Sequence, residues 1–301
     1  MMENNAQTGN ETSQIKPREP HIALLMSVCP GLGQMYAGHL ARGIALYVAL
    51  IIISWLAAIA FMYVENRIAS ILLLSVPFAG ALLIALDAFR CARKQPRNYR
   101  LARFNRSWAY AGIFLLLLVT ANPLMDFFVG KNVVRAFYVT SASMQPTILA
   151  NDILVINKLA FPKNGDIAMI EYDRQASKST QLTNVMEDQM IRRIIAGPGD
   201  TLEIRSKDVF VNGEKLVEPY AHYSDQMNKI DMSDEMNKFG PKQVPADNYF
   251  VLGDNRSFSM DSRVLGFIGK NRIGGKATKV FWSWSLAQNA IQWDRTAKAL
   301  K

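Results

Sequence analysis

The stretch "MIRRIIAGPGDTLEIRSKDVFVNGEKL", Met190–Leu216, decides the fold of the second half of the chain. Its short runs rich in Ile and Val are typical of β-strands, and turn signals separate them. Asn212 and Gly213 supply the positive φ that a two-residue hairpin turn requires, and "GPGD" at Gly197–Asp200 is a further turn. The stretch therefore predicts antiparallel strands joined by tight turns.

Similar runs surround this stretch, and no helical period of useful length lies between Ser143 and Phe281. They are "DILVINKLA" at Asp152–Ala160, "GDIAMIEY" at Gly165–Tyr172, "NYFVLGD" at Asn248–Asp254 and "GFIGKNRIGGKATKVFW" at Gly266–Trp282. Residues 130–301 are therefore predicted to form a mainly β domain. A weakly polar stretch predicts a smaller insertion near 218–245.

The first 130 residues hold the long apolar runs of the chain. Gly43–Tyr63, Ile68–Phe89 and a third run near Ser107–Val129 are each long enough to cross a hydrocarbon layer of ~30 Å as a helix. The earlier stretch His21–Leu40 is interrupted by Pro30, Gly31 and Gly33, which favours a re-entrant or interfacial hairpin. Residues 21–129 thus predict an α-helical, multi-span membrane region. Residues 1–20 lack the pattern of a cleaved signal peptide, and their polar segment Met1–Gln14 predicts a disordered cytoplasmic tail.

Charge predicts the orientation of these spans. Residues 90–106 carry basic side chains and no acidic one, namely Arg90, Arg93, Lys94, Arg97, Arg100, Arg103 and Arg106. A basic stretch can bind nucleic acid, but beside two spans the bias of cytoplasmic loops towards Lys and Arg is the favoured interpretation. The phospholipid membrane is then the partner and nucleic acid is not. Three spans place the β-rich half outside the cytoplasm.

A serine-rich turn, "VTSASMQPTIL" at Val139–Leu149, follows the last apolar run and offers a candidate nucleophile, Ser143. Both cysteines, Cys29 and Cys91, lie in the membrane half, so the β-rich half has no cysteine-based metal site. No other metal-ligand spacing is present either. We therefore expect no metal and no cofactor. The open question is which group accepts the proton of Ser143.

Several ordered blocks carry a family resemblance. "SASMQPTI" begins at Ser141, "NGDIAMI" at Asn164, "RRIIAGPGD" at Arg192, "VNGE" at Val211 and "YFVLGDNRSFSMDSRVLGFIGKNRIGGKA" at Tyr249. Over Val133–Trp284 the chain resembles bacterial type I signal peptidases (S26 family). These are serine endopeptidases of the bacterial cell (inner) membrane that remove signal peptides from exported proteins. "PGLGQMYAGHLARG", from Pro30, instead resembles a small membrane module found at the front of various bacterial proteins.

The resemblance implies a role for each motif residue. Ser143 matches the nucleophile, and Ser141 matches the hydroxyl that helps the Ser143 N–H to stabilise the oxyanion. Ser259 matches the hydroxyl that orients the general base, while Asp261 and Arg263 match a buried ion pair that supports the site. Taken alone, Ser141 and Ser259 would be read as hydroxyls that cap turns.

The family's preferred substrate follows from the same resemblance. The family reads small residues at two positions before the cut, the Ala-X-Ala pattern, in an extended peptide added to an edge strand. Ala136–Thr140 and Ile167–Ile170 would line the corresponding shallow pockets, although both runs serve equally well as β core. The predicted partners are therefore signal peptides of exported preproteins.

One residue departs from the family pattern, because Arg192 stands where the family has its catalytic lysine. A lysine has a pKa near ~10.4, and burial can lower it by ~3–5, so a neutral amine near pH 7 is reachable. An arginine begins at ~12.5–13.8, so even a fall of ~3 leaves a cost of roughly 3–5 kcal/mol for the neutral form at pH 7. General-base catalysis lowers the activation free energy by only about 3–5.5 kcal/mol. Arg192 is therefore not a credible general base.

Three interpretations remain. Another group accepts the proton, such as Lys158 or Lys163; or Arg192 acts only as a cation and turnover is slow; or the site is inactive and the domain is a scaffold or guide in protein export or in pilus or conjugation assembly. A pair of His222 with the nucleophile would need a different geometry, and a solvated histidine is favoured. Asp254 and Asp261 have arginines beside them, so ion pairs are favoured over acid–base work. A transporter is disfavoured, because the spans hold almost no ionisable residue.

Overall fold

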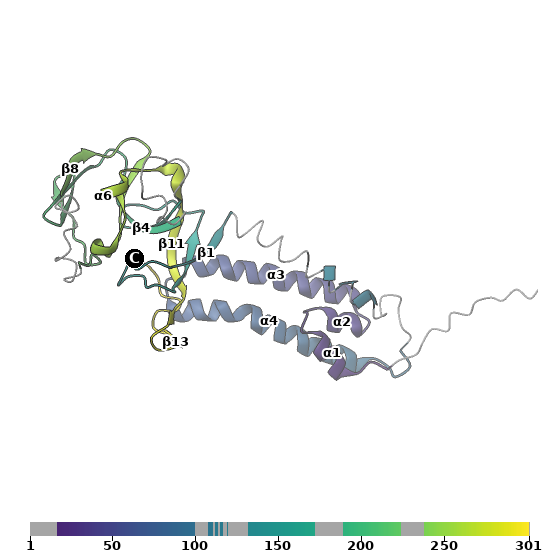
Figure 1. Ribbon diagram of the computed structural model, residues 1–301. Helices are drawn as coiled ribbons and strands as arrows, with labels where there is room; N and C mark the ends of the chain where they lie inside the picture. Colours follow the sequence, from purple (N-terminus) through teal and green to yellow (C-terminus); the bar gives the residue numbers. More distant parts are fainter. Residues whose placement is uncertain are drawn as a thin grey trace, which may run out of the picture. The chain divides into compact units, whose positions relative to one another are not determined.

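The computed structural model describes residues 17–99, 108–110, 112, 113, 115, 116, 119, 132–171, 189–223 and 238–300. The chain divides into two compact units (Figure 1). The first comprises residues 1–61 and 71–125, and the second comprises residues 62–70 and 126–301. Each unit has its own buried apolar cluster, so each is described by itself.

The first unit begins with two short helices, α1 (Pro20–Met26) and α2 (Leu32–Tyr36). Gly31, at φ +97°, separates them, and a Cβ built there would lie 2.5 Å from the carbonyl oxygen of Gly43. Only glycine permits this backbone conformation and this close approach together. The segment is therefore a broken helical hairpin, and neither helix has the length of a membrane span.

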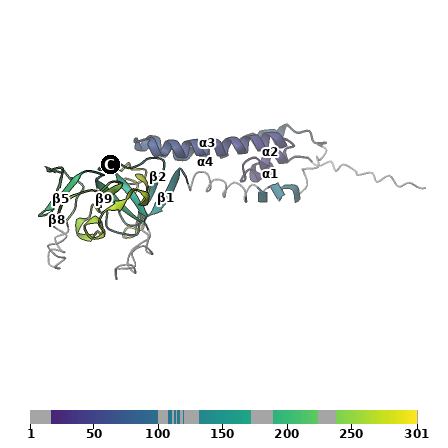
Figure 2. The ribbon, with the colours of Figure 1, turned by 90° about the horizontal axis from the view of Figure 1, so that it is seen from above.

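Two longer helices follow, α3 (Leu40–Tyr63) and α4 (Arg67–Lys94) (Figure 2). Both are long and apolar enough to cross a membrane, and they are the only two such helices among the described residues. Asp87 of α4 accepts hydrogen bonds from Arg42 and from the buried Gln34. The third expected span, near residues 107–129, lies mostly outside the described residues, so the multi-span region stays a prediction beyond these two helices.

The second unit is mainly β, as the alternating runs and turn signals predict. Its larger sheet has the order β1-β2-β11-β3-β4-β9-β10, and every neighbouring pair is antiparallel. The strands are β1 (Val134–Tyr138), β2 (Ile153–Asn157), β11 (Ile273–Trp282), β3 (Ile167–Glu171), β4 (Gln189–Ala196), β9 (Asn248–Leu252) and β10 (Ile268–Gly269). Register shifts in β11 and between β4 and β9 bend this sheet.

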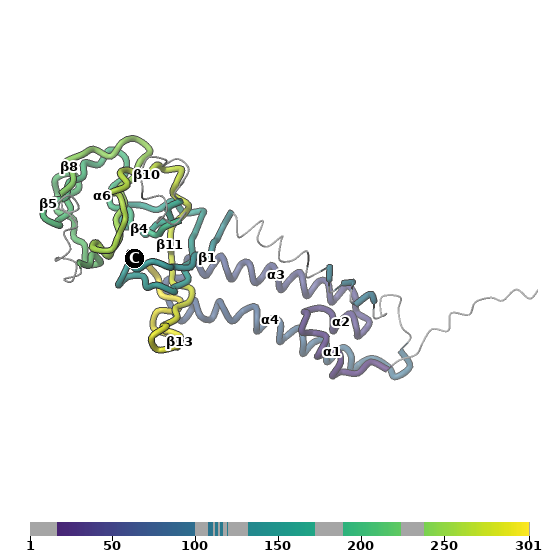
Figure 3. Tube along the Cα trace, in the orientation of Figure 1, coloured from purple at the N-terminus to yellow at the C-terminus, as the bar shows by residue number. Residues whose placement is uncertain are grey.

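A smaller sheet has the order β7-β6-β5-β8. Its strands β5 and β8 lie side by side (Figure 3). Its strands are β5 (Thr201–Arg205), β6 (Asp208–Val211), β7 (Glu214–Lys215) and β8 (Lys238–Gln243). Asn212 and Gly213 join β6 to β7 with φ values of 53° and 85°, as the Asn-Gly pair predicts. This sheet starts at Thr201, before the expected insertion at 218–245, because β5 and β6 pair with the strands that follow. A last short pair, β12 (Trp284–Ser285) and β13 (Ala290–Ile291), completes the unit.

Strand β4 runs through the interior of the larger sheet, and its residues from Met190 to Ala196 are all buried. Ile191 packs in one apolar cluster, Ile194 in a second and Ile195 in a third. Because side chains alternate along a strand, the adjacent Arg192 and Arg193 project to opposite faces. The strand thus delivers one guanidinium group to each face of the sheet.

The second unit also contains residues 62–70, the turn between α3 and α4. Lys279 of β11 is buried, and its Nζ donates to the carbonyl of Val64 and to the hydroxyl of Ser70. Arg67 donates from Nε to the carbonyl of Thr296 at 3.1 Å. Burial lowers the pKa of Lys279. This turn is therefore bonded to the β-rich part of the chain.

We predict that Ile194→Ala destabilises the second unit by about 2–5 kcal/mol, because it removes fully buried methyl and methylene groups from the centre of β4. Val217→Ala is the matched control: Val217 is 84% exposed, so a change within about 0.5 kcal/mol is expected. Urea unfolding of the full chain in detergent measures both. Equal midpoints for the two variants would contradict the placement of Ile194 in the core.

Candidate active site

The serine-rich turn connects β1 to β2, and the turn "GDNR" after β9 holds it in place. Ser143 is 3% exposed, and its carbonyl accepts a hydrogen bond from the backbone N–H of Asn255 at 3.0 Å. The side-chain amide of Asn255 donates to the carbonyl of Ala142 at 3.1 Å. The backbone N–H of Ser143 donates to the hydroxyl of Ser141 at 3.2 Å. Ser141 therefore accepts a hydrogen bond from the same Ser143 N–H with which it was expected to stabilise the oxyanion.

The far end of the same turn is fixed by the C-terminal segment. Asp152 is fully buried and accepts the backbone N–H of Leu149 at 2.9 Å. Arg295 donates from Nη2 to Asp152 at 2.6 Å and to the carbonyl of Thr147 at 3.1 Å. Arg295 is far from Asp152 in the sequence, and a backbone carbonyl has no sequence signature, so the role of Arg295 was not predicted from the sequence.

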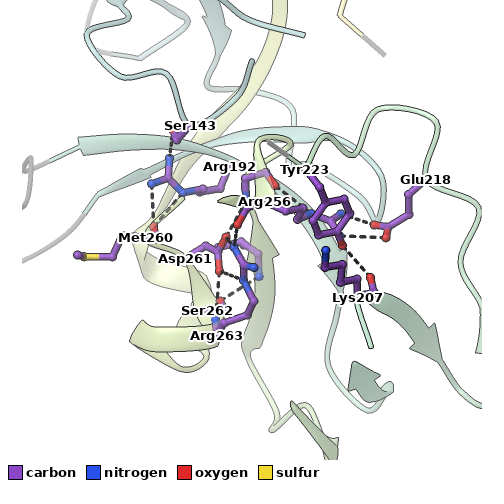
Figure 4. Close-up of polar contacts among 12 residues, drawn as sticks. Ser143, Arg192, Lys207, Glu218, Tyr223, Arg256, Met260, Asp261, Ser262 and Arg263 are labelled. Atoms are coloured by element: carbon purple, nitrogen blue, oxygen red, sulfur yellow. Dashed lines mark hydrogen bonds and ion pairs between the residues drawn. The ribbon is translucent and has the colours of Figure 1, made fainter. Parts of the chain in front are cut away.

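Arg192 meets Ser143 directly, as their motif positions led us to expect. Its Nη1 donates to the Ser143 Oγ at 2.8 Å (Figure 4). The same nitrogen donates to the carbonyl of Ile191 at 2.6 Å, while Nε and Nη2 donate to the carbonyl of Met260 at 3.1 and 2.7 Å. The guanidinium group is therefore held from several sides, and Arg192 is 5% exposed.

The contact between Arg192 and Ser143 has a fixed polarity. A guanidinium has five N–H donors and no acceptor, so the serine oxygen must be the acceptor. The hydroxyl proton of Ser143 therefore has to leave towards some other group. What the contact supplies is positive charge beside the oxygen, which favours its anionic form.

Ser259 does not orient Arg192 in the way that it was expected to orient a base. Its hydroxyl is buried and has no hydrogen-bond partner within the described part of the chain, while Arg192 reaches the neighbouring carbonyl of Met260. A Cβ built on Gly253 would lie 2.2 Å from the Ser259 Oγ and 2.6 Å from the Ser143 carbonyl oxygen. Glycine at this position thus allows the two serine segments to approach each other.

Buried ion pairs surround the site. Arg193 binds both carboxylate oxygens of Asp254, at 2.8 and 2.7 Å, and its guanidinium lies 3.8 Å from the ring centre of Tyr220. Asp254 therefore pairs with Arg193 rather than with the adjacent Arg256, whose partner is Glu218 (Figure 4). Burial and the charge of Glu218 raise the pKa of Tyr220 to about 12, against the opposing effect of Arg193.

Asp261 and Arg263 form the ion pair that the resemblance implies, at 2.8 Å and with both side chains buried. Burial alone would raise the pKa of Asp261, but the hydrogen bond and charge of Arg263 outweigh it, and the pKa lies below its usual value. The side chain of Asp261 also accepts the backbone N–H of Gly253 at 3.1 Å.

Ser143 and Arg192 line a pocket of about 210 Å³. Its walls come from the strand β1, the serine-rich turn, the strand β4 and the segment before α6 (Ser262–Leu265). The lining residues are Phe137, Val139, Thr140, Ser141, Ser143, Met144, Met190, Ile191, Arg192, Phe258 and Met260. Neither Lys158 nor Lys163 is among them, and the exposed His222 is not either. Among the described residues that line this pocket, Arg192 is the only one with an acidic or basic side chain.

We predict that Asp254→Asn destabilises the second unit by about 3–5 kcal/mol, because it leaves the charge of Arg193 buried without its carboxylate. The matched control is Asp208→Asn, which breaks an exposed ion pair with Lys215 and should cost no more than about 1 kcal/mol. Urea unfolding monitored by tryptophan fluorescence compares the two. A cost for Asp254→Asn no larger than that of its control would argue against the buried pair.

Curated relatives match about half of the chain. A signal peptidase I from Leptolyngbya laminosa is 34% identical over 154 residues, which cover 50% of this chain and 70% of the relative. A signal peptidase I P from Bacillus subtilis subsp. natto is 36% identical over 159 residues, which cover 51% of this chain and 80% of the relative.

A solved structure, a signal peptidase I from Enterococcus faecalis, is 28% identical and has a TM-score of 0.30. The match covers 40% of this chain and 98% of that chain.

The family model described as "Signal peptidase, peptidase S26" matches residues 106–282. This range contains Ser141, Ser143, Arg192, Ser259 and the pair Asp261–Arg263. It covers more than half of the chain, and the relatives named above are bacterial type I enzymes. The chain belongs to the S26 family of signal peptidases.

Proposed function

We propose that the chain is a membrane-bound serine endopeptidase that removes signal peptides from exported preproteins, with Ser143 as nucleophile and Arg192 as a fixed cation. The observation that carries this proposal is the contact of 2.8 Å between Arg192 Nη1 and Ser143 Oγ inside a pocket of about 210 Å³. The membership of the S26 family supports it, because the matched relatives are named signal peptidases.

The cation supplies electrostatic stabilisation. When Ser143 attacks the peptide carbonyl, negative charge develops first on its own oxygen and then on the carbonyl oxygen, and a guanidinium at hydrogen-bond distance stabilises both. Removing one such preorganised donor costs about 3–4 kcal/mol in other enzymes. Ser141 and the Ser143 N–H bond to each other in the resting site, and the same two groups would turn to the oxyanion of the substrate.

Arg192 cannot act as a general base, and the lack of a base limits the rate of cleavage. A positioned general base contributes about 10²–10⁴-fold, and Arg192 cannot contribute it because it has no lone pair to accept a proton. The proton of Ser143 therefore passes to water or hydroxide that enters the pocket. We expect slow turnover near neutral pH, which rises as the hydroxide concentration rises.

The pocket suits a substrate with small residues before the cut. The lining is mostly apolar, and Val139 and Met144 are almost fully buried, which leaves a small volume beside Ser143. Strand β1 pairs only with β2 among the described strands, so its outer edge can add an extended peptide. An Ala-X-Ala segment next to the end of an apolar signal helix fits both features.

The membrane placement rests on α3 and α4, which are long and apolar enough to span. The turn between them belongs to the same unit as the β-rich domain, which supports placing both on one side of the membrane. The basic residues after α4 favour the cytoplasm for the opposite side. The peptidase domain would then lie on the extracytoplasmic side of a bacterial cell membrane.

A non-catalytic relative that guides export or assembly substrates is the second candidate, and Arg192 is the observation that favours it. A domain that binds a peptide beside a permanently charged guanidinium does not need a base. The two candidates differ in one respect that can be measured, the cleavage of a preprotein.

We predict that the wild-type chain in membranes cleaves a preprotein with an Ala-X-Ala site slowly, and that Ser143→Ala does not cleave it. Arg192→Lys should be at least about tenfold faster than wild type, because a buried lysine can become neutral and accept the proton. The measurement is product formation over time at several pH values. The wild-type rate should rise about tenfold per pH unit, while that of Arg192→Lys should level off once its lysine is neutral.

Two outcomes would contradict parts of this proposal. Residual cleavage by Ser143→Ala would remove Ser143 from the role of nucleophile. Cleavage by Arg192→Lys but not by wild type would establish the non-catalytic candidate.

We predict that a cysteine placed in the turn between α3 and α4 is labelled from the same side as the peptidase domain. In a chain that carries Cys29→Ser and Cys91→Ser, Glu65→Cys should react with a membrane-impermeant maleimide added to intact cells. Arg97→Cys is the matched control, since it lies in the basic loop and should react only after the membrane is opened. The reverse pattern would place the peptidase domain in the cytoplasm.

A further inference from the structure

The guanidinium group of Arg192 is a fixed positive charge at the wall of a mostly apolar pocket. The carbonyl of Met260 accepts from Nε and Nη2, and Nη1 donates to the hydroxyl of Ser143 (Figure 4). Nη1 also donates to the carbonyl of Ile191. None of the described lining residues is acidic. The pocket thus combines apolar walls, hydroxyl groups and one strong anion donor.

We propose that this pocket binds the free C-terminal carboxylate of a peptide that ends in small residues, with Arg192 as the anion-binding residue. Arginine is the side chain best suited to bind carboxylates, because its charge is permanent and its donors are fixed in one plane. The proposed function identifies the ligand as a cleaved signal peptide, and the proposal rests on it for that identity. The anion site itself does not need turnover.

The hydrolysis step would generate this carboxylate in place. Water adds its oxygen to the acyl carbon that Ser143 Oγ carries, the bond between Oγ and that carbon breaks, and a proton returns to Oγ. The new carboxylic acid loses its remaining proton to solvent and becomes an anion. Until its bond to Oγ breaks, the carbon of this carboxylate is bonded directly to the atom to which Nη1 donates. The carboxylate therefore forms beside Arg192, and the product is retained.

The consequence is regulation of the same site by its product. A signal peptide that has been cut keeps its carboxylate on Arg192 and blocks the next substrate. In the non-catalytic alternative, the same chemistry makes the domain a receptor for peptides that another protease has already cut. Both cases predict a preference for a free acid over a neutral end.

The test uses three labelled versions of one short peptide that ends in Ala-X-Ala, with a free carboxylate, a primary amide or a positively charged aminoethyl amide. Fluorescence anisotropy with full-length Ser143→Ala in detergent measures their dissociation constants without cleavage. The acid should bind about 10- to 100-fold more tightly than the amide, as expected for a hydrogen bond to a charged group, and the cationic version more weakly than the amide. Equal affinities for the acid and the amide would overturn the proposal.

Two variants then identify the residue that causes the preference for the free acid. Arg192→Gln should bind the acid and the amide equally, while Arg205→Gln, which removes one exposed positive charge from the smaller sheet, should keep the full preference. An acid preference that survives in folded Arg192→Gln would assign the anion site to another residue. The series of three peptides needs no change at position 192, so it decides the question even where Arg192→Gln fails to fold.

The result is separable from that of the cleavage assay. An acid preference with no cleavage by wild type removes the peptidase activity and keeps the carboxylate site. Cleavage without an acid preference removes the carboxylate site and keeps the peptidase. With both present, added free-acid peptide should inhibit wild-type cleavage, and the amide at the same concentration should not.

Discussion

Strand β4 imposes the constraint on which the rest of the second unit depends, because it buries two adjacent guanidinium groups. A buried charge without partners is strongly unfavourable, so each face of the sheet must supply acceptors. On one face Arg193 donates to Asp254 and to the carbonyl of Gly165, and it stacks on the ring of Tyr220. On the other face Arg192 donates to the carbonyl of Met260 and to the hydroxyl of Ser143. The segment from Gly253 to Met260 therefore has to fold against β4, and it brings the serine-rich turn with it through Asn255.

The same constraint explains how an arginine is accommodated at position 192, where the resemblance implies a lysine. A charged side chain in this interior is stabilised by main-chain carbonyls, and those of Ile191 and Met260 are available whatever the neighbouring side chains are. The forked guanidinium reaches the carbonyl of Met260, and the hydroxyl of Ser259 has no partner among the described residues. Arg192 thus contacts Ser143 and has acceptors in the fold around it. It changes the chemistry, because the position keeps a positive charge and loses an acceptor for the proton.

Local signals in the sequence predicted the features that depend on local physics. The Asn212-Gly213 hairpin follows from backbone conformation, the β character from the alternation of apolar residues, and the break at Gly31 from glycine and proline. The motif positions also predicted that Ser143, Arg192 and the pair Asp261–Arg263 lie together. The partners that no pattern marks were missed: the Met260 carbonyl at Arg192, Glu218 at Arg256, and Arg295 below the turn. Each joins residues far apart in the sequence, or uses a carbonyl that every residue has. The start of the smaller sheet at Thr201 was missed for the same reason, since strand pairing and not composition defines it.

Peptide cleavage by a serine nucleophile needs two electrostatic conditions at different steps. A single residue at position 192 can meet both only if its charge changes between the steps. The attacking oxygen needs a neutral acceptor for its proton, and the oxyanion that follows benefits from a positive charge. A lysine with a lowered pKa meets both, since it is neutral before the attack and charged after it. An arginine meets the second condition throughout the cycle and never the first. The permanent charge of Arg192 would also attract the product carboxylate at the end of the cycle. A neutral lysine would have no strong affinity for that carboxylate. The proposed slow proton removal and the proposed product retention would therefore both follow from one fixed charge beside Ser143.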